Sequence, residues 1–333
     1  MFDVSIVVVS YNTRDITCQC IQSIVEQTHG ISYEIITVDN DSSDGSVEKI
    51  CKDFPQVILI ESGKNLGFAA GQNLGILQSK GEYILILNSD IIILDNAIAK
   101  LVSALKEGPK NLAVVGPRVQ QLDGSLAPSA RRANLGTCMN VLGVINRHFP
   151  FRRFLPEQFM RRVAGRVLGR FHDNYRSHDV RADVDYVDGM CAMVRRSAIE
   201  KVGLFDEQFF FDYEIIELSN RIKRDGWSIE LFPDAQVIHI GHVSRKKTSR
   251  ILIETIRSEL TYYAKQCPKN FKLIYRLNYI SAILKLVYLH LVSLMYSRKV
   301  EIEIYKQIVS VCKNFEPENA LREDRIPRFP TQL

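Results

Sequence analysis

The chain has 333 residues, of which 46% are hydrophobic, so it is long enough to bury a large core and to form two lobes. Its formal net charge is only +5, from 43 basic and 38 acidic side chains. This small excess suits a phosphorylated ligand or an anionic membrane surface, but it is too weak to predict nucleic-acid binding.

Short apolar runs alternate with segments of helical spacing in the first third of the chain. The expected strands are Val4–Ser10, Glu34–Val38, Val57–Glu61 and Tyr83–Leu87, and the expected helices are Ile16–Gln27, Ser46–Phe54 and Gly71–Lys80. This alternation predicts an α/β fold with a mostly parallel, doubly wound sheet.

The composition changes between Asn134 and Asp179. Seven arginines lie between Arg147 and Arg170, against a single acid, Glu157, and aromatic side chains and leucines are interleaved with them. The segment is either a pair of solvated amphipathic helices or a surface that contacts phosphates or lipid headgroups, and we favour the second interpretation.

The later elements end in an apolar helix. The expected strand is Val184–Val194, and the expected helices are Glu214–Asp225, Ile251–Lys265 and Leu277–Tyr296. Lys285 and His290 interrupt the last helix, whereas a spanning helix needs ~20 predominantly apolar residues. We therefore expect this helix to lie in a membrane interface or to pack against the body of the protein. A membrane-spanning helix is the less favoured alternative.

The cysteines and the N-terminal sequence bear on the cellular compartment. The chain has seven cysteines and no CxxC pair, so we expect free thiols in a reducing compartment and no structural zinc site. The first residues contain neither a basic segment nor a small-residue cleavage site. We therefore expect no signal peptide and a cytoplasmic protein.

Carboxylates follow two of the predicted strands. The run Leu85–Leu87 leads through Asn88 and Ser89 to Asp90, and an earlier strand ends at Asp39. Open α/β folds bind ligands at the carboxyl ends of their strands. Asp39 can accept a nucleobase N–H or ribose hydroxyls there. Asp90 either binds a divalent cation that bridges two phosphates or is a loop residue without a metal.

A glycine-spaced turn runs from Asn65 to Gly75 and leads into a predicted helix. Its small residues allow a ligand to approach the backbone closely, and helix N-termini favour phosphate. The turn matches neither the Walker motif nor the dinucleotide-binding GxGxxG pattern.

Acidic residues crowd the segment around the three consecutive phenylalanines. They are Asp206, Glu207, Asp212, Glu214 and Glu217. The preference for acids in a first helical turn explains some of them. A carboxylate held against aromatic rings can also have a raised pKa and act as a general base. His239 follows another apolar run, where it is either structural or a metal ligand.

Taken in order, these segments resemble the family 2 glycosyltransferases of the GT-A fold, and most of all the rhamnosyltransferase-type enzymes of bacterial cell-surface polysaccharide assembly. The resemblance covers about residues 3 to 265. The matching pieces are Val4–Asn12, Val38–Gly45, Asn65–Gly75, Asn88–Asp90, Asp188–Ala192, Arg195–Arg196, Gly203–Glu207 and His239–Gly241.

The resemblance implies a nucleoside diphosphate sugar, UDP- or dTDP-linked, as donor, and a divalent metal ion, Mg²⁺ or Mn²⁺, as cofactor. Asp90 stands where the family's metal-binding aspartate stands, although the first acid of that motif is Asn88 here. His239 matches a histidine that can complete the metal site, and Asp39 would read the base. The nucleotide-binding residues implied are Ser10, Tyr11, Asn12, Asp39, Asn65, Gly67, Asn73 and Ser89.

The sequence departs from the family at the general base. The family has Glu-Asp after the Phe-Phe segment, whereas this chain has Glu214-Ile215, and Glu217 represents a later family acid. Ile215 cannot take a proton and fits the apolar face of the predicted helix. Glu214 is the first candidate for the base, Asp212 is the second, and Glu217 is a further one.

The resemblance also implies a division of the chain. We expect residues 1–120 to bind the nucleotide sugar and residues 121–245, with a basic insertion at 134–180, to bind the acceptor and carry the catalytic groups. Residues 246–333 would form a helical tail that associates with membrane. The expected reaction is inverting transfer of a sugar, with rhamnose a candidate, to a glycan or lipid-linked acceptor.

The enzyme would then lie peripherally on the inner face of the cell membrane, against anionic lipid. The alternative is a catalytically impaired homologue that binds nucleotide or partner proteins. Ile215 favours this alternative, whereas Asp39, Asp90 and His239 favour the enzyme. A nucleotidyltransferase is less favoured, because the sequence has no basic activating loop near its N-terminus.

Overall fold

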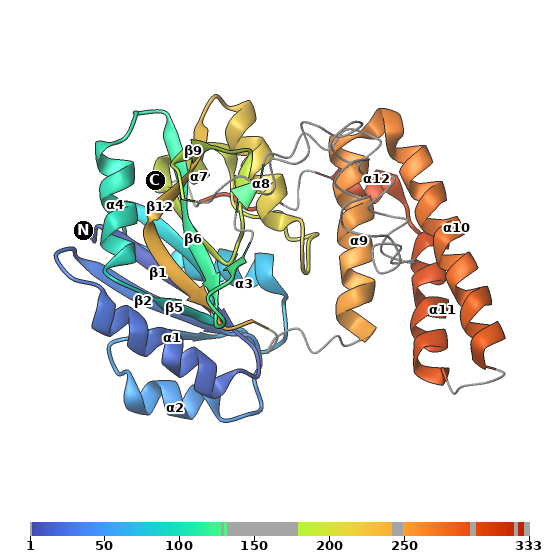
Figure 1. Cartoon of the computed structure of the whole chain (residues 1–333), viewed down its shortest axis with the longest axis horizontal. Helices are drawn as coiled ribbons and strands as arrows, with labels where there is room; N and C mark the ends of the chain where they lie inside the picture. The colour runs from blue at the N-terminus through green and yellow to red at the C-terminus, as the bar shows by residue number, and fades with distance from the viewer. Residues whose placement is uncertain are drawn as a thin grey trace.

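Figure 1 shows an α/β body with a unit of long C-terminal helices beside it. This computed structural model describes residues 2–127, 130–131, 179–241, 249–293, 298–322 and 326–329. The expected α/β fold with a helical C-terminal extension is confirmed. The arginine-rich stretch 147–170, and most of the predicted insertion at 134–180, lie outside the described residues.

The elements of the described residues follow in chain order. The strands are β1 (Val4–Ser10), β2 (Tyr33–Asp39), β3 (Ile58–Glu61), β4 (Tyr83–Asn88), β5 (Ile91–Ile93), β6 (Leu112–Gln121), β7 (Leu126–Ala127), β8 (Ala130–Arg131), β9 (Ala182–Asp183), β10 (Tyr186–Val187), β11 (Cys191–Arg195) and β12 (Ser228–His239). The helices are α1 (Arg14–Gln27), α2 (Ser46–Asp53), α3 (Phe68–Gln78), α4 (Ala97–Glu107), α7 (Arg196–Val202), α8 (Glu214–Arg224), α9 (Ser249–Gln266), α10 (Pro268–Ser293), α11 (Lys299–Lys313) and α12 (Pro317–Ala320).

The central sheet has the order β3-β2-β1-β4-β11-β6-β12-β5. Strands β3, β2, β1 and β4 are parallel, as the repeated strand–helix units predict. The remainder is mixed, because β11 runs antiparallel to both of its neighbours and β5 runs antiparallel to β12. The parallel half brings the carboxyl ends of three strands that carry predicted site residues to one edge.

The single strand predicted over Val184–Val194 is wrong, because the structure divides it. Strand β10 pairs with β8 in a separate two-stranded sheet, whereas β11 joins the central sheet. The break falls at Asp188, whose carboxylate accepts a hydrogen bond from the backbone N–H of Met190 at 3.1 Å. Such an Asx turn satisfies the backbone locally and ends the strand pairing.

Helices cover both faces of the sheet, which explains why β1 is an apolar run rather than an alternating one. Val4, Ile6 and Val8 point to the face covered by α1, α2 and α4. Val7 points to the opposite face, where α3, α7 and α8 pack. Both core clusters exclude water, and burial of one such side chain contributes about 1.5–3 kcal/mol.

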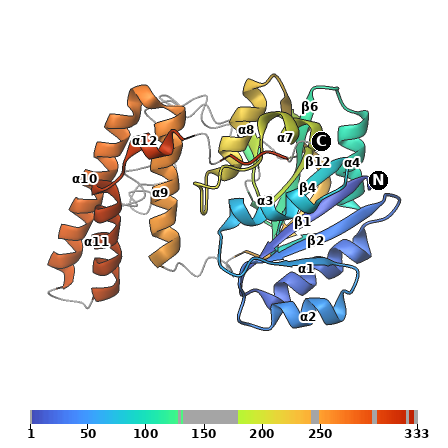
Figure 2. The same cartoon turned by 180° about the vertical axis from the view of Figure 1, so that it is seen from behind.

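The C-terminal helices form a second core of their own. Ile256 and Leu260 of α9, Ala282 of α10, and Ile308 and Cys312 of α11 are buried together. Helix α9 lies nearest to the α/β body in both views, and α10 lies on the far side (Figures 1 and 2). Among the described helices, none combines the length and the apolar character that a membrane crossing requires.

Candidate active site

The carboxyl ends of β1, β2 and β4 lie side by side at one edge of the sheet. Ser10 of β1 is in register with Asp39 of β2, and Val9 is in register with Asn88 of β4. Neighbouring strands lie about 4.8 Å apart. Asp39 therefore lies on one side of the end of β1, and the segment that leads to Asp90 lies on the other.

Asp39 is 2% exposed at the end of β2. Its Oδ1 accepts a hydrogen bond from the backbone N–H of Ser42 at 2.8 Å. Its Oδ2 is buried and has no hydrogen-bond partner among the described residues, and the same is true of Oδ1 of Asn40. A buried acceptor left unpaired costs about 1–3 kcal/mol. Unpaired buried acceptors of this kind mark places for donors of a ligand.

Ser10 and Ser89 belong to a buried hydroxyl network at the start of α1. Ser10 Oγ lies 2.8 Å from Thr17 Oγ1, and Ser89 Oγ lies 3.3 Å from Thr13 Oγ1. The network joins the ends of β1 and β4. These two predicted nucleotide-binding residues therefore connect the strand ends to the start of α1 through hydrogen bonds with threonine hydroxyls.

Asn12 and Tyr11 lie in the loop that follows β1. Asn12 has a positive φ of 51°, and its Oδ1 accepts a hydrogen bond from the Ser43 backbone N–H at 2.8 Å. Its own backbone N–H donates to Ser42 Oγ at 2.9 Å, so this loop is tied to the loop after β2. The Tyr11 side chain is 45% exposed and remains accessible to a ligand.

The glycine turn packs directly against the acidic, phenylalanine-rich segment. Gly67 has φ +83°, and a Cβ at this position would lie 2.4 Å from the carbonyl oxygen of Phe210. That oxygen accepts a hydrogen bond from the Phe68 backbone N–H at 2.9 Å. Asn65 and Asn40 fix the turn, because Asn65 Oδ1 accepts from the Gly67 N–H at 3.0 Å and Asn40 Nδ2 donates to the Gly67 carbonyl at 2.9 Å. Only glycine fits this position without displacing the neighbouring segment.

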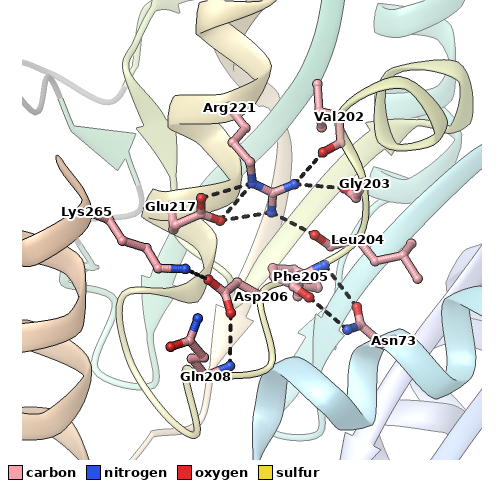
Figure 3. Close-up of polar contacts among 10 residues, drawn as sticks. All are labelled: Asn73, Val202, Gly203, Leu204, Phe205, Asp206, Gln208, Glu217, Arg221 and Lys265. Carbon is pink, nitrogen blue, oxygen red and sulfur yellow. Dashed lines mark hydrogen bonds and ion pairs between the residues drawn. The ribbon is translucent and has the colours of Figure 1, made fainter. Parts of the chain in front are cut away.

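Asn73 is buried in α3 and faces the loop that precedes α8 (Figure 3). Its Oδ1 accepts from the Phe205 N–H at 3.0 Å, and its Nδ2 donates to the Phe205 carbonyl at 2.9 Å and to Glu207 Oε1 at 3.0 Å. These bonds use both amide hydrogens. Asn73, which the resemblance assigns to the nucleotide site, therefore has the contacts of a residue that holds this loop.

Asp90 and His239 meet although they are 149 residues apart in sequence. His239 Nε2 lies 3.1 Å from Asp90 Oδ2, and the Ile240 backbone N–H donates to the Asp90 carbonyl at 2.9 Å. Pairing of β5 with β12 creates this approach, because His239 is in register with Ile91. The Asp90 side chain is 6% exposed and that of His239 is 22% exposed, so the pair opens to solvent on the histidine side.

The pair supplies one carboxylate oxygen and one imidazole nitrogen, two atoms of the kinds that bind divalent cations. Within the described ranges there is no group of three or more His, Cys, Asp or Glu side chains that could hold a metal ion. Mg²⁺ is commonly held by one or two carboxylates together with substrate phosphates and water. One carboxylate and one imidazole can therefore hold the ion only when a diphosphate supplies further ligands.

A strained turn precedes α8. Asp212 and Tyr213 both have positive φ, 64° and 69°, which is unusual for any residue other than glycine and most unusual for a bulky one. The Thr255 hydroxyl donates to Asp212 Oδ2 at 2.9 Å, and the Tyr213 hydroxyl donates to Glu259 Oε1 at 3.2 Å. Strained backbone of this kind persists only where its surroundings hold it, and it is concentrated at functional sites.

Glu214 is the first residue of α8 and is buried. Its Oε2 has no hydrogen-bond partner among the described residues. Burial, together with the nearby negative charge of Asp212, raises the pKa of the Glu214 carboxyl to about 8. A buried carboxyl with a pKa near neutrality is typical of a group that exchanges protons with a substrate.

Ile215 belongs to the hydrophobic core. It is 8% exposed and packs in the cluster beneath α8, beside Gly189 and Phe68. The apolar helical face predicted for Ile215, Leu218 and Ile222 is therefore present.

Glu217 has an ion-pair partner. The Arg221 guanidinium contacts both of its carboxylate oxygens, at 2.8–3.0 Å, and also donates to the carbonyls of Val202, Gly203 and Leu204 at 2.7–3.0 Å (Figure 3). Both side chains are largely buried. This arrangement stabilises the loop before α8 and occupies both carboxylate oxygens of Glu217.

Contacts from α9 were not predicted from the sequence. Thr255 and Glu259 contact the strained turn, and Lys265 forms a buried ion pair with Asp206 (Figure 3). The sequence signal that could have indicated these contacts is the spacing of Thr255 and Glu259, which lie four residues apart in a predicted helix. Nothing in the sequence indicated which part of the α/β body that face would meet.

Comparisons with known proteins identify the family and the fold. Residues 5–203 match the family model described as glycosyl transferase family 2. The chain is 27% identical over 216 residues to the N-acetylglucosaminyl-diphospho-decaprenol L-rhamnosyltransferase of Mycobacterium tuberculosis, a match that covers 62% of this chain and 66% of that enzyme. It is 26% identical over 241 residues to the low-salt glycan biosynthesis hexosyltransferase of Haloferax volcanii, over 71% of this chain and 67% of the relative. The chain thus spans about two thirds of the length of these relatives.

Solved structures show the same architecture. A mannosyltransferase of Pyrobaculum calidifontis, in complex with GDP-Man and Mn²⁺, matches 94% of this chain and 86% of its own with a TM-score of 0.53 at 14% identity. GalNAc-T7 with UDP, GalNAc and Mn²⁺ matches 79% of this chain and 50% of its own with a TM-score of 0.54 at 16% identity. These likenesses show the GT-A fold. Because the family model covers more than half of the sequence, the chain belongs to glycosyl transferase family 2.

Proposed function

We propose that this protein is an inverting glycosyltransferase that moves a sugar from a nucleoside diphosphate sugar to a glycan or lipid-linked acceptor in cell-surface polysaccharide synthesis. The name of the mycobacterial relative describes transfer of rhamnose to a decaprenol-linked sugar. Rhamnose is therefore the first candidate sugar, with a UDP- or dTDP-linked donor.

The nucleotide would bind along the edge formed by β2, β1 and β4. Asp39 Oδ2 is the acceptor for a nucleobase N–H, because this oxygen is buried and has no other partner in the described part of the chain. The backbone of the Gly67 turn lies next to Asn40, the residue that follows Asp39. The diphosphate would then reach Asp90 at the end of β4.

Asp90 and His239 are the residues that would hold Mg²⁺ or Mn²⁺ beside the diphosphate. A bound divalent ion would neutralise the negative charge that develops on the leaving group. His239 would approach the ion with Nε2, the nitrogen that faces Asp90.

In the transfer step the acceptor hydroxyl oxygen forms a bond to the anomeric carbon as the bond from that carbon to the diphosphate oxygen breaks. The hydroxyl proton passes to a carboxylate. Glu214 is our first choice for this base, because its unpaired Oε2 and raised pKa suit proton uptake. Asp212 is the second choice, since its carboxylate lies on the turn before α8 and is only partly buried.

The rival proposal is a catalytically impaired homologue that binds nucleotide or a partner protein. The burial of Ile215 in the core favours it, because no acid stands at the family's base position. The 3.1 Å approach of Asp90 and His239 favours the enzyme, and this observation carries our proposal. The pair lies at the carboxyl edge of the sheet and is open to solvent on the histidine side, a position that suits a ligand site.

The deciding experiment is a screen of nucleotide sugars against the full-length protein with and without Mn²⁺. It measures binding by calorimetry and transfer by release of nucleoside diphosphate in the presence of lipid-linked and soluble glycan acceptors. Metal-dependent binding with transfer supports the enzyme. Binding without transfer from any donor, together with a gain of transfer in Ile215→Asp, supports the impaired homologue.

We further propose that α10 places the enzyme on an anionic membrane surface, where a lipid-linked acceptor would be found. The outward face of α10 carries large apolar side chains that are between 51% and 63% exposed and recur at i, i+4, i+7 and i+11, as on one side of a helix. These residues are Ile280, Leu284, Val287 and Leu291.

The charge of α10 favours lipid over a second copy of the chain as the partner. Over its 26 residues the helix has no acidic side chain, and its lysine and arginine residues are Lys269, Lys272, Arg276 and Lys285. Two such faces would repel each other if they met, whereas each basic side chain near an anionic leaflet contributes about 1 kcal/mol. The apolar stripe and the basic residues together match a helix that lies in the interface plane.

A further inference from the structure

The backbone conformation of the turn before α8 decides where the candidate bases point. Asp212 and Tyr213 occupy the left-handed region, and Glu214 follows them as the first residue of α8. If Tyr213 relaxed to negative φ, the chain would enter α8 in another direction and the Asp212 and Glu214 carboxylates would move. The turn has no glycine, so the conformation must be imposed by contacts.

Helix α9 supplies contacts on one side of the turn. The Thr255 hydroxyl donates to Asp212 Oδ2 at 2.9 Å, and the Tyr213 hydroxyl donates to the buried Glu259 at 3.2 Å. The Tyr213 ring also packs on Tyr262, with centroids 5.2 Å apart. Thr255, Glu259 and Tyr262 follow at i, i+4 and i+7, so they form one face of α9.

Two further residues of α9 contact the segment ahead of the turn. The Arg250 guanidinium lies 4.7 Å from the ring centroid of Phe210, and Lys265 forms an ion pair with Asp206, whose side chain is fully buried. Figure 3 shows Lys265 reaching from α9 toward the loop that also contacts Arg221 and Asn73. The helical unit therefore contacts the loop at both ends.

The glycine turn closes the other side. The Phe210 carbonyl accepts a hydrogen bond from the Phe68 N–H at 2.9 Å and lies against Gly67. The glycine turn thus contacts the segment at Phe210, and α9 contacts it at Asp212 and Tyr213.

We propose that Thr255 and Tyr213–Glu259 are positioning contacts, through which α9 holds the Asp212–Tyr213 turn in its left-handed conformation and aims the Asp212 and Glu214 carboxylates at the acceptor. The consequence for turnover rests on the proposed transferase function, whereas the consequence for the turn itself does not. The C-terminal helices then serve the chemistry directly, in addition to any role in membrane attachment.

The test uses two variants that each remove one hydrogen bond and keep the side-chain shape. Thr255→Val leaves Asp212 Oδ2 without its donor, and Tyr213→Phe removes the bond to Glu259 while the ring remains. Thr255→Ser restores a hydroxyl and is the conservative control. Tyr279→Phe, at a partly buried residue that packs against the core of the helical unit, is the matched control for loss of a tyrosine hydroxyl.

The first readout needs no substrate. The Glu217 backbone N–H donates to the Tyr213 carbonyl at 2.9 Å, so amide exchange of Glu217 reports on the turn. We expect this exchange to rise about fivefold to tenfold in Thr255→Val and Tyr213→Phe, the loss expected for one hydrogen bond. Thr255→Ser and Tyr279→Phe should exchange as the wild type does.

The second readout is turnover. We expect kcat to fall about tenfold to 10²-fold in the two test variants, because small displacements of a catalytic group are costly. KM for the donor and metal-dependent nucleotide affinity should stay unchanged, and Thr255→Ser should retain kcat.

The two readouts separate the inference from the proposed function. Unchanged Glu217 exchange in both test variants overturns the inference whatever the activity. Unchanged kcat in an active enzyme overturns it as well. If the wild type transfers no sugar, the proposed function falls, and the exchange measurement alone decides whether α9 holds the turn.

Discussion

His239 Nε2 lies 3.1 Å from Asp90 Oδ2, so two segments 149 residues apart in sequence meet at the edge of the sheet where ligands of open α/β folds bind. The contact joins the end of the parallel half of the sheet to the last strand of the mixed half. The contact therefore requires that both halves of the sheet are assembled, and it also forms the metal site proposed here.

Asp90→Asn should remove the metal-dependent part of nucleotide affinity. The amide keeps the shape of the side chain but lacks the charge that a hard divalent cation prefers. Titration calorimetry of UDP and dTDP with and without Mn²⁺ measures the effect. Asp95→Asn is the matched control, because Asp95 is an exposed carboxylate whose salt bridge is with Lys100. Equal affinities in the presence and absence of Mn²⁺ for the wild type would contradict the metal site.

Gly67→Ala should destabilise the fold and displace the Phe210 segment. A Cβ at Gly67 would lie 2.4 Å from the Phe210 carbonyl, and the positive φ adds strain. Overpacking of this kind costs about 1–3 kcal/mol. Gly63→Ala is the matched control, because Gly63 also has positive φ, +69°, but an added Cβ there would meet no atom of the described residues within 4 Å. Chemical denaturation should therefore show a clearly larger loss for Gly67→Ala, and similar losses would argue against the close approach.

The fold could be predicted well where local pattern and tertiary environment agree. The Val4–Ser10 strand was predicted with the bounds that the structure has, because a strand buried on both faces is apolar throughout. Helix α10 begins at Pro268, nine positions before the predicted start at Leu277. Its first turns were missed because Lys269, Lys272 and Arg276 interrupt the apolar pattern, although proline is common in a first turn.

Site residues at the ends of strands could be predicted from the sequence, whereas contacts between distant segments could not. Asp39 and Asp90 end buried runs, a local pattern that parallel topology turns into a shared edge. The strain at Tyr213 and its contact with Glu259 depend on how α9 docks, which no local pattern specifies. The environment of Glu214 could likewise not be derived from its position in a predicted helix.

Glu214→Gln should lower turnover by about 10²–10⁴-fold, the usual contribution of a positioned general base. Nucleotide affinity should be unchanged, since Glu214 lies on α8 and not on the strand edge that carries Asp39. Asp212→Asn is the direct comparison. If Asp212→Asn is inactive and Glu214→Gln turns over normally, the base is Asp212. The pH dependence of kcat/KM gives a second check, because a base with a pKa of about 8 makes the rate rise with pH toward that value.

The raised pKa of Glu214 also predicts how stability depends on pH. The folded pKa of about 8 lies above the ordinary value of 4.5. Below about 4.5 the group is protonated in both states and has no effect on the pH dependence. As pH rises from 4.5 to 8, the unfolded state releases a proton that the folded state retains, so the free energy of unfolding falls.

Glu214→Gln should abolish that part of the pH dependence. Relative to the wild type the variant should gain stability on the order of a few kcal/mol by pH 8, with the difference levelling off above that pH. Urea denaturation at several pH values measures it. Asp212→Asn should show a smaller change in the same direction, because it removes a charge that raises the Glu214 pKa. Parallel stability curves for wild type and Glu214→Gln would mean that Glu214 is ionised in the folded protein.

The apolar stripe of α10 should bind anionic vesicles. In the paired variant Leu284→Gln with Leu291→Gln, vesicle affinity should fall about tenfold or more, because each leucine loses apolar burial in the interface. In Lys269→Gln with Arg276→Gln it should fall roughly thirtyfold at low salt, from about 1 kcal/mol for each charge. Sedimentation with vesicles of neutral and of anionic lipid measures both effects.

Two control variants distinguish vesicle binding by this face of α10 from nonspecific binding by the rest of the protein. Leu77 is an exposed leucine on α3 and Lys52 is an exposed lysine on α2, so Leu77→Gln and Lys52→Gln remove similar groups from the α/β body. Neither should change sedimentation, because both lie away from α10. Salt should release the wild type and the leucine variants, and its effect should be smaller in the charge variants, which retain Lys272 and Lys285. Equal recovery of wild type with neutral and anionic lipid would remove the electrostatic part of the proposal. Unchanged binding of the leucine pair would show that this face of α10 does not enter the interface.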